Sequence, residues 1–416
     1  MKTKLFFLFV LLVSQIAKSQ EVNCLEKENQ LSQFITDNEF QKAYVLWNES
    51  KVSCSNFSEK TYSLAQQVLQ YNIEVAAPDA KGDKVRELLK LYDLYDKNFP
   101  NNKNGNFEKR AMALFKNNAG SEEEIYGFLD KAFEKQNNEF SNPQAIDIYF
   151  KYYFDKYKSG KSTITLEQLF DKYNGIVSLS ESNSIKFPEN AGEYATVIQN
   201  LNSSMNDLLV CNNLIPYAQK GFETNKNNTS WLFATAKSLS VNCKMDPIFG
   251  TISNQLHLLK PTSKSAYHLA TFYLNTGNQD KAIEFYNESI SLATDKLEKA
   301  STAYTAASIL VNSDAAKSKE MLLVAMENNP NNGKYYIFLG SLYANSVGEC
   351  GTNQNEKKAI YKLASDTVLK AYTVEPRLKP TSEIMSKEYL KNVVFEKNEK
   401  IKSVKIGCWI NQTVQF

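Results

Sequence analysis

The sequence predicts an all-α fold, an α-α superhelix of successive helical hairpins that ends in a short extended C-terminal tail. Three observations support this prediction. Apolar residues recur at intervals of three and four along most of the chain. Only 15 glycines and 10 prolines interrupt 416 residues, which favours long helices joined by short turns. Small residues at Ala270, Ala306 and Gly340 are 36 and then 34 residues apart, a period typical of repeated helix pairs.

Residues 1–19 have the features of a signal peptide. Lys2 and Lys4 precede an apolar run that begins at Leu5, and Ala17 and Ser19 occupy the two positions that a signal peptidase recognises. The run is too short to cross a bilayer. We therefore expect an exported protein of the periplasm or the cell surface that does not span the membrane, with a mature chain from about residue 20.

The mature composition gives no electrostatic signal for nucleic acid. Without Lys2, Lys4 and Lys18, 48 − 3 = 45 basic residues face 46 acidic ones. Zinc-type spacings of cysteine and histidine are absent, and neither His257 nor His268 lies in a recognisable nucleophile context. We expect a protein that is not an enzyme, with no cofactor, no catalytic residue and no metal site.

Six cysteines in an exported chain predict three disulfides, although six cysteines permit fifteen pairings. Spacing favours neighbouring partners, because two of the pairs would each bracket a helical hairpin. The favoured pairs are Cys24 with Cys54, Cys211 with Cys243, and Cys350 with Cys408.

The GKST stretch at residues 160–163 has the last letters of a phosphate-binding loop. That loop requires a glycine where this chain has Asp155, and a strand before it. The preceding segment instead has helical periodicity, with apolar residues on one face at Ile146, Tyr149, Phe150, Tyr153, Phe154 and Tyr157. Thr165 and Gln168 then fit a capping box, so we predict a turn between two helices.

The C-terminal half contains the most specific motif. Tyr336, Leu339-Gly340 and Tyr343 match the start of the tetratricopeptide repeat, W-x2-L-G-x2-Y. The chain therefore resembles the tetratricopeptide-repeat (TPR) family, which implies a solenoid of helix pairs. The expected organisation is degenerate repeats at 20–260, recognisable repeats within 261–380 (263–296, 299–332 and 333–378, the last with an insertion at 345–357), and a capping helix and tail at 381–416.

Further phrases resemble exported TPR proteins of Bacteroidota. They are Glu349-Cys-Gly-Thr, Lys357-Lys-Ala and Ile406-Gly-Cys-Trp-Ile410. The resemblance implies a Gram-negative cell envelope but names no activity. It favours a non-enzymatic scaffold that binds a protein partner and associates at most peripherally with an outer-membrane complex. The alternative is a glycan-binding component of an outer-membrane uptake system, since starch-binding proteins of these bacteria are built around TPR helices.

In TPR proteins the first helix of each pair faces the concave side, the usual site for a partner. The basic and asparagine clamp that some members use for a C-terminal carboxylate is absent from these slots. We expect partner contacts at Tyr267, Thr271, Leu274, Ala303, Ala307, Lys334, Ile337 and Ser341. The tail at 402–416 alternates like a strand, and we expect it to fold back on the last helices, held by Cys408.

Overall fold

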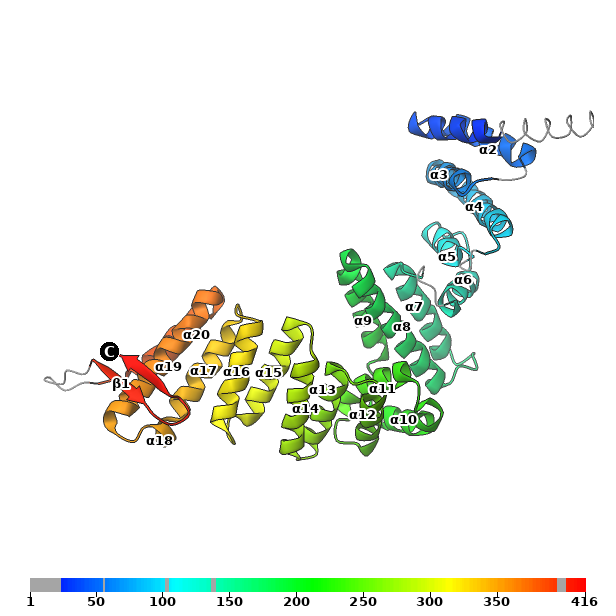
Figure 1. Ribbon diagram of the computed structural model, residues 1–416. Coiled ribbons are helices and arrows are strands. Elements are labelled where there is room, and N and C mark those ends of the chain that lie inside the picture. The colour runs from blue at the N-terminus through cyan, green and yellow to red at the C-terminus, as the bar shows by residue number, and fades with distance from the viewer. Residues whose placement is uncertain (1–23, 55–56, 102–104, 136–139, 395–401) are drawn as a thin grey trace, which may run out of the picture. The chain divides into compact units, whose positions relative to one another are not determined.

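The computed structural model describes residues 24–54, 57–101, 105–135, 140–394 and 402–416 (Figure 1). The chain divides into two compact units, Met1–Asn206 and Asp207–Phe416. In both units helices pack mainly on their neighbours in sequence, as expected of a solenoid of helical hairpins. The predicted signal peptide at 1–19 lies outside the described residues.

The regular structure among the described residues of the first unit is helical. Residues 24–36 form a helix, and the helices that follow are α2 (Phe40–Ser53), α3 (Glu59–Val75), α4 (Pro78–Asn98), α5 (Phe107–Lys116), α6 (Glu122–Glu134), α7 (Pro143–Lys158), α8 (Leu166–Lys186), η1 (Pro188–Asn190) and α9 (Ala191–Met205). The helical face predicted on α7 forms part of the core, since Ile146, Tyr149 and Phe150 are buried there.

The GKST stretch lies in the connection between α7 and α8. Gly160 follows the end of α7 with a φ of +65°, a left-handed conformation that glycine adopts without strain. The Ser162 hydroxyl donates to the Lys156 carbonyl oxygen at 3.0 Å, so it helps to close the turn. Thr165 and Gln168 form the predicted capping box at the start of α8. The motif is an interhelix turn.

A partly buried polar cluster joins α6, α7 and α8. The Lys172 ammonium donates to the Tyr149 hydroxyl at 2.6 Å and lies 3.2 Å from the Asp130 carboxylate, and the Tyr126 hydroxyl donates to the same carboxylate at 3.1 Å. Burial alone would raise the pKa of Asp130, but the hydrogen bond from Tyr149 and the charge of Lys172 hold that pKa below its ordinary value. The cluster therefore holds a charged pair, Asp130 with Lys172, between three helices.

The second unit contains the helix pairs with the recognisable motif. Its elements are α10 (Cys211–Asn225), α11 (Thr229–Asn242), α12 (Pro247–Leu259), α13 (Ser263–Asn275), α14 (Gln279–Leu292), α15 (Lys296–Leu310), α16 (Ala315–Asn328), α17 (Gly333–Asn345), α18 (Val347–Cys350), α19 (Gln354–Val374), η2 (Pro376–Leu378), α20 (Lys379–Leu390), β1 (Ser403–Ile406) and β2 (Gln412–Gln415). Its most extensive helix contacts are α13 with α14, α15 with α16, and α17 with α19.

Small residues let the two helices of each pair approach closely. Ala270 on α13 and Ala282 on α14 have no exposed surface and pack in one cluster with Tyr286. On α17, a Cβ at Gly340 would lie 2.4 Å from the Val368 Cγ1 atom and 2.9 Å from the Ala364 carbonyl oxygen of α19. Only glycine fits at this crossing, which explains the glycine of the sequence motif.

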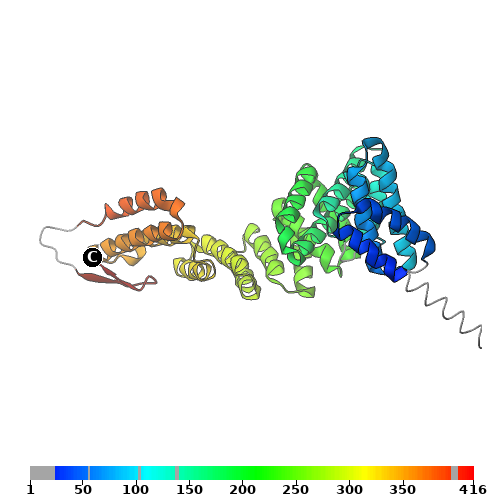
Figure 2. The same ribbon diagram turned by 90° about the horizontal axis from the view of Figure 1, so that it is seen from above.

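A β-hairpin covers the end of the second unit. Strands β1 and β2 pair antiparallel, from Ser403 with Gln415 to Ile406 with Gln412, and both contact α19 (Figures 1 and 2). Ile406, Ile410 and Val414 are buried in the core cluster that also holds Cys350. The Lys319 ammonium of α16 donates to the Ile410 carbonyl oxygen at 2.9 Å, so the tail is bound to the helices as predicted.

Three disulfides are formed, between Cys24 and Cys54, Cys211 and Cys243, and Cys350 and Cys408. They are the pairs that the spacing favours. Three disulfides indicate an oxidising, extracytoplasmic environment, because cytosolic thiols are kept reduced. Among the described helices, none combines the length and the apolar character that crossing a membrane requires.

Replacement of Gly340 by alanine should destabilise the second unit by about 1–3 kcal/mol, because the new methyl group meets α19 backbone that cannot yield. Urea unfolding followed by circular dichroism measures the loss, and hydrogen exchange locates it on α17 and α19. The control is Gly127→Ala on α6, where a Cβ meets no atom within 4 Å and helix propensity predicts a gain of about 1 kcal/mol. Equal effects of the two substitutions would contradict the packing argument.

Removal of the C-terminal disulfide by Cys350→Ser with Cys408→Ser should release the hairpin. The bond closes a separation of 58 residues, for which loop entropy predicts about 4 kcal/mol. We expect faster hydrogen exchange in residues 402–416, while Cys24→Ser with Cys54→Ser leaves that exchange unchanged. Undiminished protection of the tail in the first variant would show that packing alone holds it.

Candidate functional site

The predicted partner contacts lie on the first helices of three successive pairs, α13, α15 and α17. Tyr267 is 37% exposed and Lys334 is exposed, whereas Thr271 is buried, so its prediction as a partner contact was wrong, and its hydroxyl donates to the Tyr267 carbonyl oxygen. Leu274, Ile337 and Ser341 are half-buried. These residues alternate with core positions in the pattern of a helix that has one face in the core.

On α15 the two predicted partner contacts were wrong, and other residues face outward. Ala303 and Ala307 have no exposed surface and pack in the core, so a partner would find nothing to contact there. The outward residues of α15 are Ser301, Tyr304 and Ser308, of which the two serines are exposed and the tyrosine is half-buried. The order of buried and exposed residues along α15 matches the order along α17 when the two helices are aligned with an offset of 33 residues. In this alignment Ala307 corresponds to Gly340.

The reason for the shift is an additional turn at the start of α15. Lys264 and Lys334, the first outward residues of α13 and α17, each lie two positions after the N-cap residue. On α15 the corresponding Ser301 lies six positions after its N-cap, Asp295. Because Ala306 and Ala307 are both small, the sequence alone did not show which of them occupies the crossing.

We define the first-helix face as the set of outward residues at equivalent positions on these three helices. It comprises Lys264 and Tyr267 on α13, Ser301, Tyr304 and Ser308 on α15, and Lys334, Ile337 and Ser341 on α17. The face is a mixture of hydroxyl, aromatic and ammonium groups with one aliphatic side chain, that of Ile337. The Tyr304 ring is fixed against Tyr335 and Phe338 of α17, with ring centroids 5.2 and 5.6 Å apart, so it offers a pre-positioned aromatic edge.

One end of the first-helix face is partly covered by the chain itself. The Tyr389 hydroxyl of α20 lies 3.5 Å from the Ser341 hydroxyl, and Tyr389 packs against the core cluster beneath it. Contacts with a partner are therefore more accessible on α13 and α15 than at Ser341.

A serine, a histidine and a glutamate lie in the order of a hydrolase triad between α12, α13 and α14. The His257 Nδ1 atom is 2.9 Å from the Ser265 hydroxyl, and its Nε2 atom is 3.1 Å from the Glu288 carboxylate. Ser265, however, is fully buried and belongs to the capping box of α13, where its oxygen accepts from the Thr262 amide and donates to main-chain carbonyls. A substrate could not reach this oxygen, so the arrangement stabilises a helix start.

His268 is a neutral core residue of the second unit. It is 7% exposed, its ring packs against Phe233 and Phe249, and its Nδ1 atom has no hydrogen-bond partner within the described structure. Burial, with the positive charges of Lys237 and Lys264, lowers its pKa to about 4. Across the described residues, no three His, Cys, Asp or Glu side chains are grouped so that they could hold a metal ion.

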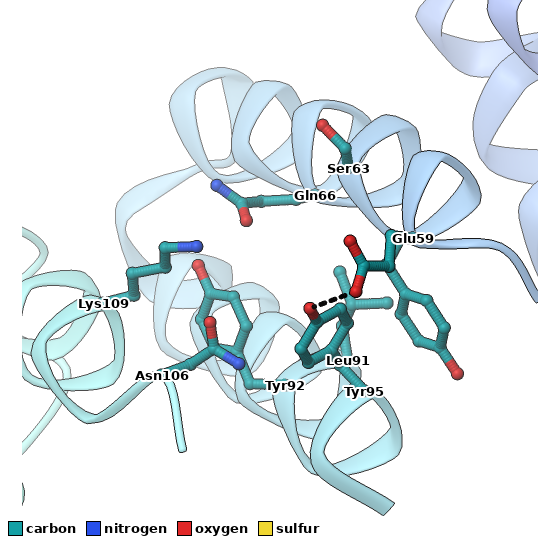
Figure 3. Close-up of a pocket in the computed structure, with 9 residues that line it drawn as sticks. Glu59, Ser63, Gln66, Leu91, Tyr92, Tyr95, Asn106 and Lys109 are labelled. Carbon is teal, nitrogen blue, oxygen red and sulfur yellow. Dashed lines mark hydrogen bonds between the residues drawn. The ribbon is translucent and has the colours of Figure 1, made fainter. Parts of the chain in front are cut away.

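A pocket that the sequence analysis missed lies in the first unit, between α3, α4 and the start of α5 (Figure 3). Its volume is about 260 Å³. Its lining residues are Glu59, Tyr62, Ser63, Gln66, Leu91, Tyr92, Tyr95, Asn106 and Lys109. Tyr92 and Tyr95 belong to the Leu-Tyr-Asp-Leu-Tyr stretch at 91–95. Their spacing of three residues is that of neighbours on one side of a helix, but it carries no information about the approach of α3 and α5.

The comparisons with known proteins leave the function open. No family model matches the chain, and no curated protein matches it. Among solved structures, the chain is similar to the APC/C hetero-tetramer Cut9–Hcn1, at 12% identity over 89% of this chain and 83% of that chain, with a TM-score of 0.27. A likeness at this TM-score carries no argument, so the candidate sites rest on their own geometry.

Replacement of His268 by leucine should reduce the dependence of stability on pH. The folded pKa lies below the unfolded value of about 6.5, so the unfolded chain binds more protons and stability falls as pH drops from about 6.5 to about 4. Between pH 7 and pH 4.5 the wild type should lose about 2 kcal/mol more than His268→Leu, as measured by urea unfolding. The difference in stability between the two proteins at pH 8, where the histidine is neutral, measures the effect of the substitution on packing and is subtracted. If the stabilities of the two proteins changed in parallel with pH, His268 would not be the group responsible.

Proposed function

We propose that this protein is a non-enzymatic scaffold of the bacterial cell envelope, periplasmic or surface-exposed, that binds a protein partner through the first-helix face. The observation that supports it is the recurrence of one outward face at equivalent positions of α13, α15 and α17. Successive equivalent faces form an extended surface that suits a peptide or a loop of a folded partner. The resemblance to exported TPR proteins of Bacteroidota supports the envelope location.

We also propose the following domain organisation. The helical hairpins of residues 20–260 are degenerate repeats of the same solenoid, and those of 261–380 are its recognisable repeats. The segment 381–416 closes the array, because α20 and the hairpin pack on α19. Terminal caps with a polar outer surface are what repeat arrays require for solubility.

The test of the scaffold proposal is purification of the tagged protein from its native envelope after mild crosslinking, with identification of the partner and the crosslinked residues by mass spectrometry. Ser308→Arg should lower partner recovery at least tenfold, since a long charged side chain then projects from the middle of the face. The matched control is Ser291→Arg on α14. Both serines are exposed, and each hydroxyl bonds a main-chain carbonyl of its own helix.

Three results would contradict the proposal. The first is recovery of one partner with equal yield from both arginine variants. The second is a set of crosslinks confined to residues outside α13, α15 and α17. The third is the absence of any specific protein beside the tagged chain.

A further inference from the structure

The pocket of the first unit has opposite charges at its two ends. Figure 3 shows the Glu59 carboxylate at one end and the Lys109 ammonium at the other. Neither side chain forms an ion pair with another described residue, and the Glu59 carboxylate accepts only a long hydrogen bond, of 3.4 Å, from the Tyr95 hydroxyl. Both charges therefore remain available to a ligand that carries the complementary groups.

Neutral hydrogen-bonding groups lie between these charges. Gln66 projects from α3 on one side, and Leu91 and Tyr92 of α4 lie on the other (Figure 3). Burial raises the pKa of Tyr92 to about 12, so its hydroxyl stays protonated and can donate a hydrogen bond at physiological pH. The middle of the pocket thus offers hydroxyl and amide groups above one apolar side chain.

Ion pairs and a hydrogen bond join the two helices α4 and α5 that support the pocket. Arg110, which is buried, pairs with Asp93 at 2.7 Å and with Asp96 at 2.8 Å, and so ties α5 to α4 directly behind Tyr92. The Asn106 amide donates to Asp96 at 3.0 Å. Because α5 carries Lys109, these bonds hold the stretch of helix from which this exposed side chain projects close to the tyrosines. A site whose geometry is set before binding loses less conformational entropy when the ligand arrives.

We propose that this pocket binds a short zwitterionic peptide, of about the size of a dipeptide. The ligand's ammonium group pairs with Glu59, its carboxylate pairs with Lys109, and its amide bonds with Gln66 and the Tyr92 hydroxyl. A volume of about 260 Å³ is below the range of about 300–1,000 Å³ typical of drug-sized ligands, which fits an occupant of this size. The proposal does not depend on the scaffold function, because it concerns other helices.

A neutral sugar is the main competing occupant, since tyrosines and amides also line sugar sites. It would leave Glu59 and Lys109 without partners of opposite charge. A zwitterion satisfies both ends at once, and a pair of charge-assisted hydrogen bonds is stronger than the neutral bonds that a hydroxyl would form. The charges at the ends are therefore the feature that decides between the two classes.

The experiment titrates the full mature chain with a panel of dipeptides that differ in side chain, and with the N-acetylated and C-amidated form of the tightest binder, by calorimetry and ligand-observed NMR. Glu59→Gln should weaken dipeptide binding at least tenfold but leave the affinity of the N-acetylated form unchanged. Lys109→Met should show the same selectivity toward the C-amidated form. This pairing of protein and ligand changes isolates each contact.

The controls are Glu74→Gln on α3 and Lys116→Met on α5, which are exposed residues of the same helices outside the pocket. Both should bind the dipeptide like the wild type. Three outcomes would overturn the proposal: no dipeptide binds, the two pocket variants weaken blocked and free peptides equally, or glucose and maltose bind in competition with no effect of either charge change. The last outcome would assign the pocket to a neutral sugar.

Discussion

The close approach of the two helices in each pair is the contact on which the second unit depends. A single amphipathic hairpin cannot bury its apolar face, so it must pack against both its own partner helix and the next pair. Gly340 against Val368 and Ala270 with Ala282 set the separation of their pairs. Larger residues such as Tyr286 and Leu322 then fill the space between pairs, where they have almost no exposed surface.

This packing also decides which residues face outward. Once Ala307 occupies the crossing on α15, Ser301, Tyr304 and Ser308 must lie on the opposite side, because a helix repeats every 3.6 residues. The additional first turn of α15 therefore changes the face without changing the core. The surface that we propose for a partner is a consequence of core packing rather than a separate feature.

Polar groups at the helix junctions are used mainly for structure. Ser265 with His257 and Glu288 has the composition of a catalytic triad but serves a helix cap, and Lys172 with Asp130 and Tyr149 joins three helices. Glu59 and Lys109 differ from these groups, since no other described residue pairs with their charges across the pocket. The charged groups at the helix junctions already have partners, whereas Glu59 and Lys109 have no ion-pair partner among the described residues. For this reason the pocket is the better candidate for a small ligand.

The sequence by itself determined the all-α solenoid, the turn at Gly160 and the capping box of Thr165, and it favoured the cysteine pairs that the structure contains. All of these depend on neighbours along the chain, through helical periodicity, capping and loop length. Only the tertiary structure decided whether Ala306 or Ala307 lies at the helix crossing. It also placed His268 in the core and brought Glu59 and Lys109 to one pocket. Those features depend on the side chains of other helices, whose distance and orientation are set when apolar faces pack together.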